Sequence, residues 1–261
     1  MDEHASVNRA FWDEIAPHHA GSDHYAVEEF RANPDSLGEI ERRELGDIAG
    51  RTICHLQCHI GLDTLSLARL GADVTGVDFS AESIRIAREL AERTGIAGRF
   101  VECDVLTAAA TLGTTYDVVF TTRGVLMWLG DLDAWAANCA QLLRPGGVFY
   151  LLDIHPLALA LEQSGDGLRL SSSYFGGMTP TVTVADASYA VRDVGLRHGE
   201  THEWIHPVGA VVSALIAAGI VVEFLHEHPT DALAPTKLSA TDEQPGVPEL
   251  PGLYSIRGHL G

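Results

Sequence analysis

Between residues 51 and 156 the chain alternates short apolar runs with longer amphipathic segments. Runs of this length predict buried strands, and the apolar period of the intervening segments predicts helices. We expect strands over residues 51–57, 72–79, 99–105, 116–122 and 148–154, and helices over 63–71, 81–95 and 132–147. Ser80 is expected to cap the second of these helices, while Pro145 and the glycines after it end the third. The alternation predicts an α/β fold, with a parallel sheet covered by helices on both faces.

The segments on either side of this alternation have different patterns. Residues 1–46 predict an irregular helical region, with breaks at Pro34 and Asp35 and with Ser36 as the cap of a third helix. Residues 157–205 contain β-rich pieces and no clear helix, so we expect an insertion that packs over the carboxyl edge of the sheet. The pattern then predicts a helix over 206–219, strands over 220–229 and 252–260, and a proline-rich surface loop over 230–251.

The charge balance narrows the choice of partners. Lys and Arg number 17 against 36 Asp and Glu, for a net charge of −19. Nucleic-acid binders need a basic surface, and anionic membranes repel an acidic one, so we expect neither partner. The four cysteines form no CxxC pair, and the first residues lack the pattern of a signal peptide. These features predict a reduced, cytoplasmic protein, and we expect it to be a monomer or a homodimer.

Three loops carry polar chemistry at the expected carboxyl edge of the sheet, where doubly wound folds bind their ligands. The turn at 57–61 contains Gly61, which allows close approach of a ligand to the backbone or serves the turn alone. Asp78 ends the second strand, where it either accepts ribose hydroxyls or interacts with the dipole of the next helix. Asp104 and Val105 lie at the end of the third strand and either bind adenine or form a solvated strand end.

At this point the sequence resembles a known family. The stretch ICHLQCHIGLDTLSLARLGADVTGVDFSAESIRIARELA, with CDV at 103–105, YDVVFTT at 116–122 and LLRPGG at 142–147, is similar to the class I S-adenosylmethionine-dependent methyltransferases. The resemblance covers residues 50–155 and implies a Rossmann-like sheet of seven strands, the last one antiparallel. It also implies S-adenosylmethionine as the cofactor and S-adenosylhomocysteine as the product.

The resemblance carries over to particular positions. It implies a cofactor site made of Gln57, Cys58, Gly61, Asp78, Phe79, Asp104, Val105, Thr121 and Tyr25. The chain departs from the family's DxGxGxG motif, because only the last glycine is present, as Gly61, and His55 stands where the family usually has an acid. These departures leave open how the methionine end of the cofactor is held.

The same resemblance suggests a division of the chain and a small-molecule acceptor. Residues 1–50 would form a helical lid, 51–156 with 206–261 the cofactor domain, and 157–205 an inserted, substrate-covering segment. A histidine has a pKa suited to removing the acceptor's proton, and His155 and His206 are the candidates. Possible pocket walls are Trp12, His18, Trp128, Tyr174 and Trp204. His226 and His228 share one side of a strand, but two ligands do not make a metal site, so we expect none.

Other functions remain open from the sequence. The altered glycine motif is compatible with a cyclase, or another non-methylating enzyme, that uses the positive charge of the bound sulfonium. A nicotinamide oxidoreductase is disfavoured because the chain lacks GxGxxG, and a non-catalytic nucleotide-binding module is the alternative of another class. A nucleic-acid or protein methyltransferase is disfavoured by the charge and by TTRGVLMW at 121–128, where such enzymes carry NPPY- or DPPY-like segments.

Overall fold

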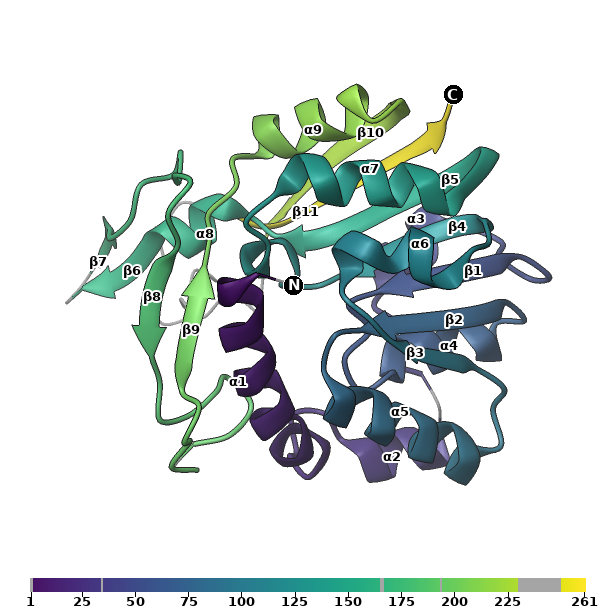
Figure 1. Ribbon diagram of the computed structural model, residues 1–261, viewed down its shortest axis with the longest axis horizontal. Coiled ribbons are helices and arrows are strands. Elements are labelled where there is room, and N and C mark those ends of the chain that lie inside the picture. Colours follow the sequence, from purple (N-terminus) through teal and green to yellow (C-terminus); the bar gives the residue numbers. More distant parts are fainter. Residues whose placement is uncertain (1, 34, 165–166, 193, 230–249) are drawn as a thin grey trace.

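A seven-stranded sheet forms the centre of the computed structural model, which describes residues 2–33, 35–164, 167–192, 194–229 and 250–261 (Figure 1). Its strands, in spatial order, are β10 (Ile220–Pro229), β11 (Pro251–Leu260), β5 (Leu143–Ile154), β4 (Tyr116–Thr122), β1 (Thr52–Leu56), β2 (Asp73–Asp78) and β3 (Arg99–Glu102). β11 runs antiparallel to both of its neighbours, and the remaining neighbouring pairs are parallel. The expected seven-stranded, mostly parallel sheet with an antiparallel last strand is confirmed.

Helices cover both faces of this sheet. They are α1 (Glu3–Ala20), α2 (Val27–Ala32), α3 (Glu39–Leu45), α4 (Leu62–Arg69), α5 (Ala81–Thr94), α6 (Ala108–Leu112), α7 (Leu132–Leu142), α8 (Pro156–Ala160) and α9 (Val208–Ala217), with 3-10 turns η1 (Val105–Thr107) and η2 (Leu126–Trp128). Successive strand residues point to opposite faces, so Phe149 packs in the core under α7 and α9 while Tyr150 packs in the core that contains Leu67 of α4. No helix in the described part of the chain is long and apolar enough to cross a membrane.

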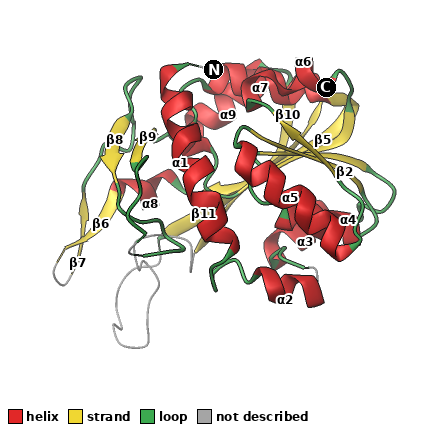
Figure 2. Ribbon diagram, turned by 60° about the horizontal axis from the view of Figure 1, so that its bottom comes forward, coloured by secondary structure: helices red, strands yellow, loops and turns green. Residues whose placement is uncertain are grey.

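The N-terminal helix and the insertion lie together beside the carboxyl edge of the sheet. The insertion forms two hairpins, β6 (Leu161–Ser164) with β7 (Gly167–Leu170) and β8 (Thr181–Val184) with β9 (Glu200–Glu203). Figures 1 and 2 both show α1 between the β8–β9 hairpin and α5. The Asn8 amide joins α1 to β9, because its oxygen accepts from the His202 N–H and its nitrogen donates to the His202 carbonyl, both at 2.8 Å.

Several local expectations were wrong. Ser36 does not cap α3: Gly38 occupies that position, and the Ser36 hydroxyl binds the Asp63 carboxylate instead. α7 ends at Leu142, before Pro145, because β5 begins at the next residue. The insertion begins with the short helix α8, which was not expected. The proline-rich loop expected at 230–251 lies, over residues 230–249, outside the described residues.

Candidate active site

The turn that follows β1 has a tightly wound backbone. Gln57, His59 and Gly61 have φ angles of +56°, +48° and +83°, in the left-handed region that non-glycine residues seldom adopt. The Cys58 N–H donates to the Val77 carbonyl at 2.9 Å, which attaches the turn to β2. Two strained polar positions at a strand end are typical of a functional site.

Asp78, at the end of β2, is bonded to the same turn. Its carboxylate accepts from the His59 N–H at 2.8 Å and from the Ser80 N–H at 2.9 Å. Burial raises the pKa of Asp78 to about 6, although these N–H donors favour the charged form. Ser80 also caps α5 as expected, because its hydroxyl accepts from the Ser83 N–H.

Gly61 has a packing role that the structure makes visible. A Cβ at this position would lie 2.8 Å from the Ala87 Cβ and 2.8 Å from the Phe100 Cε1. The missing side chain therefore lets α4 begin directly against α5 and β3. This packing role does not conflict with a contact between the Gly61 backbone and a cofactor.

The other positions expected to bind cofactor lie near the ends of β2, β3 and β4. Asp104 accepts from the Leu106 N–H at 2.9 Å and so caps η1, Val105 is buried, and Phe79 is half-buried. Thr121 pairs with Leu56 in the register of β4 and β1, and its hydroxyl is buried without a hydrogen-bond partner among the described residues. The Gln57 Oε1, one residue beyond Leu56, is also buried without a hydrogen-bond partner among the described residues. Two unpartnered buried polar atoms at adjacent strand ends fit a polar ligand.

A chain of hydrogen bonds covers the turn. It runs from Ser83 on α5 to the His59 Nδ1 at 3.0 Å, from the His59 Nε2 to the His19 Nδ1 at 3.0 Å, and from the His19 Nε2 to Ser188 in the insertion at 2.8 Å. Burial lowers the pKa of His19 to about 3 and that of His59 well below its ordinary value, so both rings are neutral near pH 7. The chain connects α1, the insertion and the turn through uncharged groups.

Aromatic rings surround this chain. Trp12 contacts His59 and Trp128 edge-on, with ring centroids 5.1 and 5.2 Å apart. Tyr25 stacks on His19 at 4.9 Å, and its hydroxyl bonds that of Tyr189 in the insertion. The structure thus brings together Trp12, Trp128 and Tyr25 from the expected set.

A separate hollow lies beyond the carboxyl ends of β4 and β5. We call it the β4–β5 hollow; its cavity volume is about 10 Å³, room for roughly one water molecule, and it is lined by Gly124, Leu126, Met127, Asp153, Ile154, Pro156, Leu159, Trp204, His206 and Tyr254. It adjoins the turn after β1, because the Gln57 Nε2 donates at 3.0 Å to the carbonyl of Val125, between two lining residues. Two predicted residues, Trp204 and His206, are therefore neighbours in one hollow.

Asp153 organises the loop at the floor of the β4–β5 hollow. One of its carboxylate oxygens accepts from the N–H groups of Gly124 and Val125, and the other from that of Leu126 at 3.0 Å. Its own strand contributes a further donor, the Ile154 N–H at 2.8 Å. Burial raises the pKa of Asp153, and the surrounding N–H donors oppose that shift. This residue was missed, although an acid at the carboxyl end of a buried strand is the same signal that identified Asp78.

His155 and two of the expected pocket residues, His18 and Tyr174, do not line this hollow. The His155 Nδ1 accepts from the Leu157 N–H and its Nε2 bonds Glu227 at 3.0 Å, so both ring nitrogens have structural partners and the ring is poorly placed to act as a base. His18 is exposed on α1, whereas its neighbour His19 is buried, because adjacent helix residues point in different directions. The Tyr174 hydroxyl accepts a long 3.4 Å bond from the Val208 N–H.

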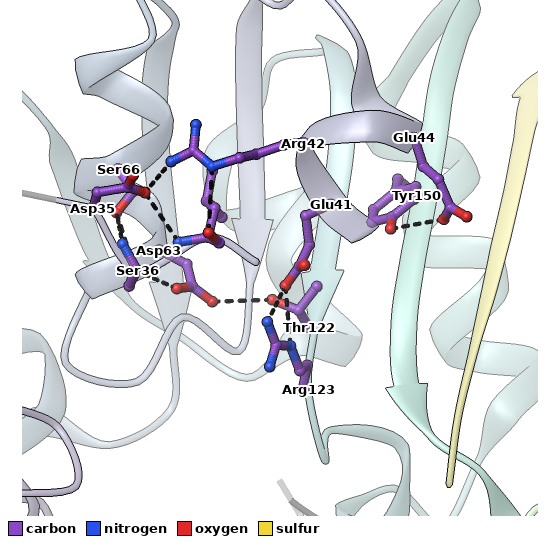
Figure 3. A network of polar contacts seen from close by, with 11 residues as sticks. Asp35, Ser36, Glu41, Arg42, Glu44, Asp63, Ser66, Thr122, Arg123 and Tyr150 are labelled. Carbon is purple, nitrogen blue, oxygen red and sulfur yellow. Dashed lines mark hydrogen bonds and ion pairs between the residues drawn. The ribbon is translucent and has the colours of Figure 1, made fainter. Parts of the chain in front are cut away.

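A network of hydrogen bonds and ion pairs links the N-terminal segment to the end of β4 (Figure 3). The Asp63 carboxylate accepts from Ser36 and, at 3.3 Å, from Thr122 at the end of β4. The next residue, Arg123, donates from Nε at 3.0 Å to Glu41 of α3, whose side chain is 1% exposed. The network joins the N-terminal helices to the loop that carries Val125, and thereby holds that loop in position.

Comparison with known proteins points to one class of enzyme. Residues 54–149 match the family described as a methyltransferase domain. The ubiquinone biosynthesis O-methyltransferase of Pectobacterium carotovorum subsp. carotovorum (strain PC1) is 36% identical over 130 residues, which are 50% of this chain and 54% of that protein. The enzyme of the same name from Proteus mirabilis (strain HI4320) is 33% identical over 154 residues, 58% of each chain. The chain spans about half the length of the curated relatives it matches.

Solved structures agree with this assignment at the level of the fold. An S-adenosylmethionine-dependent methyltransferase from Mesorhizobium loti superposes with a TM-score of 0.61 at 21% identity, covering 84% of this chain and 95% of the other. The DhpI–SAH complex superposes with a TM-score of 0.61 at 17% identity, covering 99% of this chain and 97% of the other. Residues 54–149 therefore match a methyltransferase domain, and the chain has the fold of these solved S-adenosylmethionine-dependent methyltransferases.

Proposed function

We propose that this protein binds S-adenosylmethionine and transfers its methyl group to a small molecule. One observation carries the proposal: Asp78 and the turn at 57–61 are hydrogen-bonded to each other at the carboxyl edge of the sheet. They lie where the strand order reverses, since β1 has β2 on one side and β4 on the other. Doubly wound sheets bind nucleotide ligands at this reversal.

The residues at this edge fit the parts of such a cofactor. The carboxylate of Asp78 suits the ribose hydroxyls, and Asp104 with Val105 suits the adenine. The unpartnered Gln57 Oε1 and Thr121 hydroxyl suit the amino group of the methionine end, which departs from the family's usual motif. Tyr25, Phe79, Cys58 and Gly61 complete the proposed site. When bound, the cofactor supplies a methyl group activated by its positive sulfur.

His206 is the proposed base. Its Nε2 lies 2.7 Å from the Leu129 carbonyl, which can only accept, so Nε2 carries the proton of the neutral ring. Burial lowers the pKa of His206, which keeps the ring neutral near pH 7. Bound S-adenosylmethionine would supply the methyl group, and His206 would take the proton that the acceptor's oxygen or nitrogen gives up.

Residues 1–50 and 157–205 act as covers in this proposal. α1 and the insertion meet over the turn through His19 and Ser188, so ligand entry requires them to separate. The acidic surface supports a small-molecule acceptor over nucleic acid, and a cytoplasmic monomer or homodimer remains our prediction.

A labelled-methyl assay tests the function. Purified full-length protein is incubated with methyl-labelled cofactor and panels of hydroxyl, amine and carbon acceptors, and S-adenosylhomocysteine is quantified. Methylated product with stoichiometric S-adenosylhomocysteine supports the proposal. Turnover of an acceptor without S-adenosylhomocysteine would instead identify a non-methylating enzyme, such as a cyclase. Binding of a nicotinamide dinucleotide alone would overturn the cofactor assignment.

A further inference from the structure

We propose that β8 is a dimerisation strand, which pairs antiparallel with the β8 of a second copy of this chain. The pairing joins the two β8–β9 hairpins into one continuous sheet across a two-fold axis. It makes the protein a homodimer, whatever reaction the protein catalyses.

β8 is the outer strand of its hairpin. It pairs with β9 on one side, and Figures 1 and 2 show it on the side of β9 that faces away from α1. No further strand pairs with it in the described part of the chain. All of its residues are exposed, with Val182 at 56% and Val184 at 73%. An edge of this kind presents backbone donors and acceptors to another strand.

The outward backbone groups of β8 belong to Val182 and Val184. The Ala185 N–H donates to the carbonyl of Gly199 at 2.9 Å, so these two residues form a hydrogen-bonded pair at the end of the hairpin. Hydrogen-bonded pairs alternate along an antiparallel ladder, and Thr183 therefore turns its N–H and C=O toward β9. The N–H and C=O groups of Val182 and Val184 point the other way, toward the free edge.

These outward groups select one register for self-pairing. With the two-fold axis at Thr183, Val182 lies opposite Val184 of the second copy, and the two valines exchange both of their backbone hydrogen bonds. The valines of both copies then lie together on one face of the joined sheet. With the axis at Val182, Val184 would instead lie opposite Pro180, which has no N–H to donate. The sequence of β8 thus matches its own antiparallel copy in the register centred on Thr183.

The distribution of charge favours a second copy at this edge. Residues 170–185 contain no Asp, Glu, Lys, Arg or His, in a chain with a net charge of −19. Two copies repel each other through their acidic surfaces, and this uncharged stretch lets them approach with the least repulsion.

The edge strands of the central sheet are protected in a way that β8 is not. β3 begins at Arg99, and β10 contains Glu223 and Glu227 together with a bulge between Val222 and Phe224. Charged residues and bulges on an edge strand oppose pairing with another molecule. β8 has no charged residue and a regular register with β9, so it remains able to pair.

Sedimentation of the full-length protein tests the proposal. We expect the wild-type protein to be a dimer at micromolar concentration. Val182→Glu places a charge at the pairing edge and should raise the dissociation constant of the dimer at least about tenfold. Val221→Glu is the matched control, because Val221 is 50% exposed on β10 and the change adds the same charge. A monomeric wild-type protein would overturn the proposal, as would equal weakening of the dimer by both variants.

An engineered disulfide tests the register. The Thr183 residues of the two copies form a non-hydrogen-bonded pair with Cα atoms about 4.5 Å apart, a separation that a disulfide can span. Thr183→Cys should therefore give a covalent dimer with oxidised glutathione, whereas Thr181→Cys, two residues away on the same face, should not. Wild-type protein is the control for the native cysteines, of which three are buried and Cys103 is half-buried. Crosslinking of neither variant, or equal crosslinking of both, would contradict the proposed pairing.

Discussion

The backbone N–H of His59 donates a 2.8 Å hydrogen bond to the carboxylate of Asp78. The turn that follows β1 and the acid that ends β2 therefore form a single unit, although 19 positions separate them in the sequence. A change in the charge of Asp78 affects both the turn and any ligand that the acid binds.

The first prediction concerns Asp78 and pH. Its carboxyl has a pKa of about 6 in the free protein, so it becomes protonated as the pH falls through 6 and loses its ability to accept two ribose hydroxyls. We expect affinity for S-adenosylhomocysteine to weaken below about pH 6, and Asp78→Asn to bind at least about tenfold more weakly at pH 7. Calorimetry between pH 5 and 8 measures both. Asp73→Asn, at the exposed start of β2, should retain the wild-type pH dependence.

The second prediction concerns His206. His206→Gln should reduce kcat by about 10²-fold or more, because general-base catalysis is lost, while affinity for S-adenosylhomocysteine stays the same. Since the pKa of this histidine is lowered, the wild-type rate should persist below pH 6.5 before its acid limb begins. Rate–pH profiles for both proteins measure this. His155→Gln is the control; a loss of kcat in that variant equal to the loss in His206→Gln would contradict the assignment.

The third prediction concerns Gly61. Gly61→Ala combines a left-handed φ of +83° with a Cβ that lies 2.8 Å from neighbouring atoms, so it should lower the free energy of unfolding by more than about 2 kcal/mol. Gly113→Ala has a similar φ of +61° but open space around the added Cβ, so it should lower the free energy of unfolding only by the conformational cost of about 1 kcal/mol. Denaturant unfolding compares the two. Equal losses would show that packing against Ala87 and Phe100 contributes nothing.

The fourth prediction concerns two buried histidines, His19 and His55. Their pKa values are about 3 when folded, whereas in the unfolded chain they take up protons near pH 6.5. Stability should therefore fall as the pH drops from 6.5 toward 3, by about 1.4 kcal/mol per pH unit for each ring. His55→Asn removes one titrating ring at a position bonded to Thr64 and should flatten the dependence. An unaltered slope in this variant would contradict the prediction.

The fifth prediction concerns the network of Figure 3. Arg123→Met leaves the buried carboxylate of Glu41 without its cation and should cost about 3–5 kcal/mol of stability. Arg42→Met removes a similar ion pair with Asp35, whose carboxylate is 42% exposed, and should cost far less. Thermal and denaturant unfolding measure the difference, and similar losses would show that burial of the pair is unimportant.

The sequence by itself determined the sheet, the order of its elements and the acid at the end of β2. These features depend on local patterns. Apolar runs form strands and amphipathic runs form helices, and Ser80 caps α5 by accepting a hydrogen bond from Ser83, three residues further along the chain. The ends of helices and strands were less well predicted, because a residue near such an end can form its hydrogen bonds either within its own element or with a distant one. Ser36 bonds Asp63 and not the first turn of α3, a choice that becomes available only when α4 lies beside it.

Only the tertiary structure decided which polar side chains meet. His155 and His206 looked equivalent along the chain, yet one has both ring nitrogens engaged and the other lines the β4–β5 hollow. The pairing of His19 with His59 was likewise invisible in the pattern, and so were the hydrogen bonds from the loop after β4 to Asp153. The physical reason is that hydrophobic periodicity reports which face of an element is buried, whereas a site is defined by the few hydrogen bonds that form when distant elements pack together.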